Sequence, residues 1–165
     1  MKALEALARL CAILAGVLMV FITMMTVVSI IGRELLGAPI VGDFELSGAV
    51  AGAAIALFMP WCQAKRGNII VDFFTSGLSA GTHAVMDRLG ALALALVMAL
   101  VAWRTSVGGL NAYNTHSGTT ILGFPDWVTY ACMVPPLALT AVIAFVQAAS
   151  GFGTDEAPSN PELSV

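Results

Sequence analysis

Charged residues are scarce in this sequence. Asp, Glu, Lys and Arg make up 10% of its 165 residues, whereas 59% are hydrophobic, and the mean hydropathy is +0.92. Soluble domains carry about 25% charged residues, so this composition excludes a chain built from ordinary soluble domains. It predicts an integral membrane protein.

Ionisable side chains are also missing from the middle of every long apolar run. A charge in the middle of a membrane span is energetically expensive, and where it occurs it marks a functional site by default. Here all Asp, Glu, Lys, Arg and His residues fall at or near the expected helix ends, so a proton or ion relay has no candidate members. His83 and His116 lie at opposite ends of their spans and cannot ligate one haem together.

Motifs for catalysis and cofactor binding are lacking as well. The three cysteines, Cys11, Cys62 and Cys132, all lie in apolar runs and form no C-x-x-C pair, so small buried hydrophobes are the expected role. There is no phosphate-binding loop and no nucleophile motif. We therefore predict no catalytic residue, no metal, no cofactor and no nucleic-acid partner.

Charge-free runs cover residues 10–32, 46–64, 89–103 and 127–154. A membrane-spanning helix needs about 20 apolar residues, so the third run is long enough only if its helix continues past Arg104 to about Leu110 while the guanidinium reaches outward. We predict an all-α membrane domain, residues 1–152, with four transmembrane helices at about 8–34, 43–65, 82–110 and 126–150. Residues 153–165 are predicted to be a flexible cytoplasmic tail.

The distribution of cations predicts the orientation. Five Lys and Arg residues flank the spans on one side and two on the other: Lys2, Arg9, Lys65, Arg66 and Arg88 against Arg33 and Arg104. Cytoplasmic loops carry the excess of cations, so both termini and the central loop are expected in the cytoplasm. The first run is longer than a signal-peptide core and lacks an A-x-A site, which indicates an uncleaved anchor.

Four charged residues are expected to meet at the opposite, outer side: Arg33, Asp43, Glu45 and Arg104. Charges at the edge of a low-dielectric layer are stabilised when opposite signs pair. We hypothesise that Glu45 pairs with Arg33 or Arg104. The alternative is that Asp43 and Glu45 favour the N-terminal dipole of the second helix.

Two spans carry features of helix packing. Gly48 and Gly52 form a GxxxG step among alanines, a surface that lets another helix approach closely, within the four-helix unit or in another subunit. Pro135 and Pro136 interrupt the fourth span and should kink it.

The stretch that joins the second and third spans is amphipathic. Lys65 and Arg66 suit the anionic headgroups of membrane lipids at the cytoplasmic interface, and Gly67 suits a helix C-terminus. Apolar and polar residues then occupy opposite helical faces: Ile69, Ile70, Phe73, Phe74 and Leu78 against Asn68, Asp72, Thr75, Ser76 and Ser79. This pattern predicts a short helix lying in the membrane interface. The alternative is a connector that covers the end of the bundle.

Two short patterns occur at the ends of the first two spans: Arg33, Pro39-Ile40, Asp43 and Glu45, and then Arg66-Gly67, Ile70, Val71 and Asp72. They resemble those of a known family, the DctQ-like small membrane subunits of tripartite ATP-independent periplasmic (TRAP) transporters. The resemblance covers about Leu4 to Phe152. The chain departs from the family at Asn68, where His is common, and at Val41-Gly42, where an aromatic residue is common.

The resemblance implies a three-component importer in a bacterial inner membrane. Its other parts would be a large membrane subunit that holds the solute and sodium sites, and a periplasmic substrate-binding protein, and it would take up organic acids with the sodium gradient. The small-residue faces would pack on the large subunit, and the outer loops would help dock the binding protein through Asn111, Tyr113, Asn114 and Trp127.

Other classes are left open by the residues alone. A small proton-coupled exporter should place an acid in mid-span, and a membrane anchor of a redox enzyme should show paired histidines at matched depth. Neither feature is present. An assembly subunit of another complex has no distinguishing sequence feature.

Overall fold

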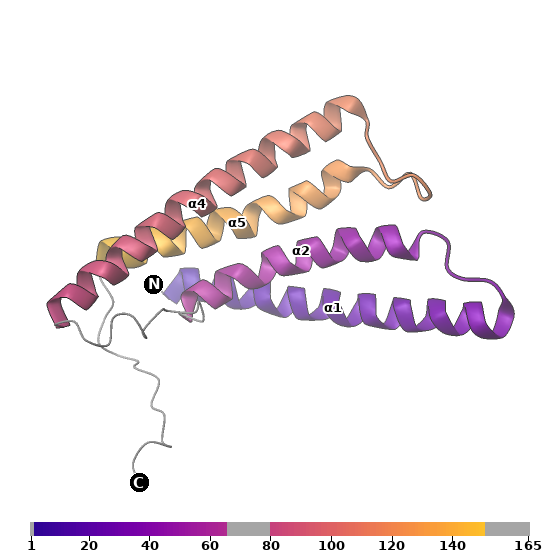
Figure 1. Ribbon diagram of the computed structural model, residues 1–165, viewed down its shortest axis with the longest axis horizontal. Helices are drawn as coiled ribbons and strands as arrows, with labels where there is room; N and C mark the ends of the chain where they lie inside the picture. Colours follow the sequence, from indigo (N-terminus) through magenta and orange to yellow (C-terminus); the bar gives the residue numbers. More distant parts are fainter. Residues whose placement is uncertain (1, 66–79, 151–165) are drawn as a thin grey trace, which may run out of the picture.

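The computed structural model describes residues 2–65 and 80–150, which form four α-helices (Figure 1). They are α1 (Lys2–Leu36), α2 (Asp43–Ala64), α4 (Ala80–Thr115) and α5 (Asp126–Ser150). Within these two ranges there is no strand, and the sole bridge pairs Gly118 with Pro125. All four helices are long and apolar enough to cross a membrane. The prediction of an all-α chain with four membrane-length helices is confirmed.

Two of the helices are much longer than the membrane core requires. Helices α1 and α4 contain 35 and 36 residues, or about 50 Å at 1.5 Å per residue, whereas the hydrocarbon core is about 30 Å thick. Helix α4 continues past Arg104 to Thr115, as the short third run required. Both helices therefore extend beyond the core at one or both ends.

The four helices form two hairpins that meet along one pair of helices. Residues 37–42 connect α1 to α2, residues 116–125 connect α4 to α5, and α2 packs against α5. The resulting order is α4, α5, α2, α1, with the hairpins diverging toward the two loops (Figure 1). We call the end that holds both loops the loop end, and the other the terminal end.

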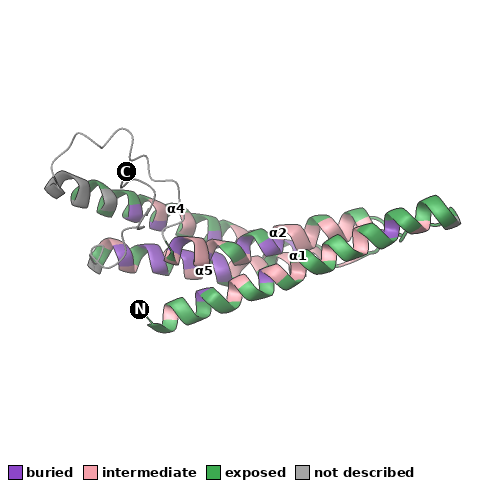
Figure 2. Cartoon of the chain, turned by 90° about the horizontal axis from the view of Figure 1, so that it is seen from below, coloured by how far each residue is buried: buried purple, intermediate pink, exposed green. Residues whose placement is uncertain are grey.

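The buried share of each helix depends on its place in this order of helices. In the most apolar stretch of each helix, 39% of the residues are buried in α5 but only 6% in α1. Figure 2 shows the same gradient, with buried positions concentrated on α5 and α2 and exposed ones on α1. Helix α5 is thus the central helix of this chain, and α1 presents most of its apolar surface outward.

Alanine dominates the contacts between the helices. Ala56 of α2, Ala102 of α4 and Leu137 of α5 form the buried cluster, with three methionines packed at its edge: Met59, Met98 and Met133. Helices in a membrane gain little from the hydrophobic effect and associate through close van der Waals packing of small residues. The Ala-rich faces of the sequence therefore become the contacts among α2, α4 and α5.

The predicted glycine step divides between two environments. A Cβ added at Gly52 would lie 3.9 Å from Met133 Cε, so this glycine faces α5. A Cβ added at Gly48 would meet nothing within 4 Å, and Gly48 is exposed. Within the described residues, Gly52 therefore packs against α5, whereas Gly48 has no helix packed against it.

Helix α5 is continuous through its two prolines. Pro136 is buried and Pro135 is exposed, and the Thr140 hydroxyl donates to the Pro136 carbonyl at 2.8 Å. The kink expected here stays a prediction. Helix α2 contains a proline of its own, Pro60, which is among the largest fully buried side chains in the described residues.

A buried pair of glutamines joins α2 to α5 near the terminal end. The Gln63 side-chain amide donates to Oε1 of Gln147 at 2.7 Å, and Nε2 of Gln147 donates to the Gln63 carbonyl at 3.1 Å. Both residues are less than a tenth exposed. Buried polar groups need hydrogen-bond partners, so this pair fixes the register of the central helix contact. Neither glutamine is charged, and the pair was not predicted from the sequence.

We expect Gln147→Leu to destabilise the isolated chain by about 1 kcal/mol, because Gln63 loses a buried partner. The measurement is the unfolding midpoint in mixed detergent micelles. Thr23→Val is a matched control, since that exposed hydroxyl bonds only the Met19 carbonyl of its own helix. Equal midpoints for the two variants would contradict a role for the pair.

Candidate functional site at the loop end

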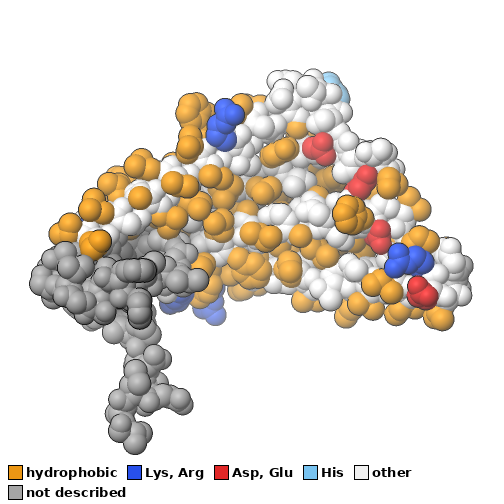
Figure 3. Space-filling model, in the orientation of Figure 1, with side chains coloured by type: hydrophobic (Ala, Val, Ile, Leu, Met, Phe, Trp, Pro, Cys, Tyr) orange, Lys and Arg blue, Asp and Glu red, His pale blue; other side chains and the backbone are white. Residues whose placement is uncertain are grey.

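The loop end brings residues 37–42 and 116–125 together at the start of α2. In Figure 1 the loop after α4 descends across the space between the hairpins toward that helix start. Figure 3 shows that the acidic side chains visible on this face gather at the same end. The candidate site is the set of contacts that joins these two loops to α2.

The loop 116–125 is closed by hydrogen bonds to Thr119. The Thr119 N–H donates to the Phe124 carbonyl at 2.9 Å, the Thr119 carbonyl accepts from the Gly123 N–H at 3.0 Å, and the Thr119 hydroxyl oxygen accepts from the Phe124 N–H at 3.0 Å. Gly123 adopts a φ of 62°, a left-handed conformation that glycine takes without strain. These bonds leave the N–H groups of Ile121 and Leu122 to bind outside the loop.

Glu45 of α2 accepts both of those N–H groups. Its Oε1 accepts from Ile121 at 3.0 Å, and its Oε2 accepts from Ile121 and from Leu122 at 3.2 Å each. Successive backbone N–H groups form a concave binding place for an anion, and bonds to a charged acceptor are stronger than neutral ones. One carboxylate therefore ties the first turn of α2 to the loop of the other hairpin.

Gly42 completes this junction on the α2 side. It has a φ of 77°, and a Cβ added there would lie 2.3 Å from Leu122 Cγ. Both the backbone conformation and the close approach of Leu122 require glycine at this position.

The other acid of α2 binds within its own hairpin. The buried Ser29 hydroxyl donates to Asp43 Oδ2 at 2.5 Å and accepts from the Ile40 N–H at 3.2 Å. Oδ1 of Asp43 accepts from the Phe44 N–H at 2.7 Å. Asp43 thus fixes the loop 37–42 against α1 and covers the N-terminus of α2.

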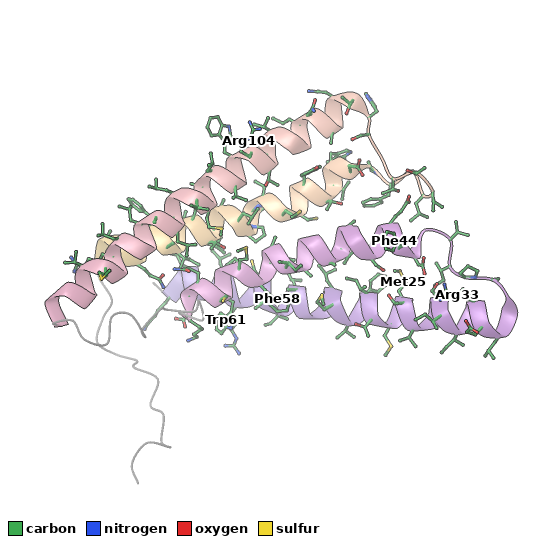
Figure 4. All side chains as sticks on the ribbon, in the orientation of Figure 1. Met25, Arg33, Phe44, Phe58, Trp61 and Arg104 are labelled. Atoms are coloured by element: carbon green, nitrogen blue, oxygen red, sulfur yellow. The ribbon has the colours of Figure 1, made fainter. Side chains whose placement is uncertain are left out.

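These contacts correct the expected ion-pair cluster. In the part of the chain that the structure describes, neither Asp43 nor Glu45 has a cation within 4 Å, and Glu45 has loop amides as partners instead of Arg33 or Arg104. Arg104 is exposed on α4, far along the other hairpin from Arg33 (Figure 4). The alternative expectation, acids in the first turn of α2, matches the positions observed.

The ion pair of the described residues lies at the terminal end. Lys65 Nζ is 2.8 Å from Glu5 Oε1 and 5.2 Å from the ring centre of Trp61, so it links the start of α1 to the end of α2. Both charged groups are about half exposed, and such pairs contribute little stability. The rest of the predicted interfacial motif lies outside the described residues: Arg66, Gly67, Asn68 and Asp72, together with the interfacial helix.

The four residues predicted to dock a binding protein are all exposed at the loop end. Asn111, Tyr113 and Asn114 lie in the last turns of α4, and Trp127 lies in the first turn of α5. The rings of Tyr113 and Trp127 pack edge to face with centroids 5.8 Å apart. They lie at the two ends of the loop 116–125.

No metal centre is formed by these residues. Within residues 2–65 and 80–150, no three His, Cys, Asp or Glu side chains are grouped so as to hold an ion. The chemistry that this end offers is hydrogen bonding and aromatic contact, which suits recognition of another macromolecule.

We expect Gly42→Ala to destabilise the chain by about 1–2 kcal/mol, because alanine at positive φ is strained and its Cβ meets Leu122. Gly48→Ala is the matched control and should leave the stability unchanged or higher, since its Cβ meets nothing. Unfolding midpoints in detergent measure both. A Gly42→Ala midpoint at or above that of Gly48→Ala would contradict the described packing.

Comparison with known proteins identifies the family. A profile of the DctQ component of the tripartite ATP-independent periplasmic transporters matches residues 22–154. No curated protein and no solved structure matches the chain. The matched range includes the second half of α1, all of α2, α4 and α5, and every contact of the loop end. The chain therefore belongs to the DctQ family and is a small membrane subunit of a tripartite ATP-independent periplasmic transporter.

Proposed function

We propose that this small subunit is a scaffold for the large transport subunit and helps to dock the periplasmic binding protein. The observation that carries the scaffold is the outward exposure of its membrane helices: only 6% of the most apolar stretch of α1 is buried within the chain. Membrane lipid can cover such apolar surface as well as a protein can. Exposure alone therefore does not identify the side of the chain that contacts the large subunit.

Gly48 indicates that side on α2. A glycine inside a helix is about 1 kcal/mol less favourable than alanine, and no contact among the described residues offsets this difference at Gly48. Glycine on a membrane helix lets a neighbouring helix come close. On this proposal the large subunit packs along the open side of α2, which also carries Ile55.

The loop end faces the periplasm in this proposal. The excess of cations at the other side supports this orientation, with both termini and residues 66–79 in the cytoplasm. Lys65 and Trp61 would then lie at the cytoplasmic interface, where anionic lipid headgroups attract cations and aromatic rings are enriched. The exposed Tyr113, Trp127 and neighbouring asparagines would form part of the docking surface.

The transported solute and the driving ion are assigned to the large subunit. No Asp, Glu or His lies in the middle of a described membrane helix, so α1, α2, α4 and α5 offer no acid to bind sodium inside the membrane. The charged side chain farthest from a helix end is Arg104 of α4, and it is exposed. We propose that the complete system imports organic acids with sodium across the bacterial inner membrane, and that this chain contributes no solute contact.

We expect sodium-driven uptake into liposomes only when this chain, the large subunit and the binding protein are all present. The measurement is uptake of a radiolabelled organic acid under an inward sodium gradient, with the gradient collapsed as the control. Uptake at an undiminished rate by the large subunit and the binding protein alone would contradict a required role for this chain.

A further inference from the structure

The two hairpins are joined by hydrogen bonds at two places within residues 2–65 and 80–150. Gln63 and Gln147 form one, at the terminal end, and Glu45 forms the other, at the loop end. Because the hairpins diverge toward the loop end, the loop 116–125 bridges the wider side of the molecule (Figure 1). Its hydrogen bonds to α2 within the described residues are all accepted by the carboxylate of Glu45.

Backbone N–H groups of the loop 116–125 bind a carboxylate from the other hairpin. The loop's internal hydrogen bonds converge on Thr119, and the two N–H groups at its tip, of Ile121 and Leu122, both point to Glu45. Leu122 also rests against Gly42, where no side chain intervenes. The N–H groups and the leucine side chain thus bind neighbouring points of the same helix start, which fixes both the position and the orientation of the loop.

We propose that Glu45 is a positioning residue for docking of the binding protein. Its carboxylate holds the loop 116–125 against α2. This loop joins the ends of α4 and α5 that carry Tyr113 and Trp127, whose rings pack on each other. A surface held in its binding conformation loses less entropy on association than a mobile one. This inference rests on the docking role proposed above and assigns the residue that organises the docking surface.

The test is uptake by the complete reconstituted transporter at increasing concentrations of the binding protein. Glu45→Ala should raise the half-saturating concentration of binding protein about tenfold and leave the maximal rate within about twofold of the wild-type value. Glu45→Gln should show a smaller rise, because its amide oxygen still accepts one N–H. Glu34→Gln, an exposed acid in the last turns of α1, is the control and should behave as the wild type.

A second measurement, hydrogen exchange, tests directly whether Glu45 protects the loop amides. Hydrogen exchange of the Ile121 and Leu122 amides should become faster in Glu45→Gln, whereas the Ala-rich centre of α5 keeps its protection. Unchanged exchange at both amides would overturn the proposal, as would a lower maximal rate with an unchanged half-saturating concentration. Absence of uptake by the wild-type complex would instead contradict the proposed function, and the exchange result separates the two failures.

Discussion

The contact between α2 and α5 determines the arrangement of this protein. Each of these helices carries one outer helix, so the place of α1 and α4 depends on how α2 and α5 meet. Small residues bring the two helices close, and a glutamine pair near the terminal end fixes their register. At the loop end the helices diverge, and the loop 116–125, held by Glu45, bridges them. Polar contacts thus secure both ends of a packing surface that is otherwise apolar.

The number and place of the helices were predictable because a membrane imposes a minimum length on an uncharged run. The ends of α1 and α4 were less so: α1 begins at Lys2, before the expected start at about residue 8, and α4 ends at Thr115, beyond the expected end at about Leu110. The partners of Glu45 were not predictable at all. They are backbone N–H groups of a loop more than 70 residues later in the chain, and backbone groups leave no signature in a sequence. The glutamine pair was not predicted either, because its two residues are uncharged.

The two loops are also in direct contact at Gly42. The first loop has Val41-Gly42 between the Pro-Ile pair and the acids. Leu122 occupies the space next to Gly42, within reach of any side chain placed there. The loop of the second hairpin therefore places an apolar side chain against the glycine of the first loop, and a larger residue at position 42 would displace it.

The large subunit is proposed to pack along the open side of α2, and a photocross-linking experiment tests this most directly. A photoreactive phenylalanine analogue at Ile55, two turns after Gly48 and 63% exposed, probes that side, and the same group at Val97 of α4, 53% exposed, serves as the reference. The account predicts a cross-link from residue 55 to the large subunit that is several times stronger than that from residue 97. Cross-linking of residue 55 to lipid alone, in a complex that co-purifies intact, would contradict it.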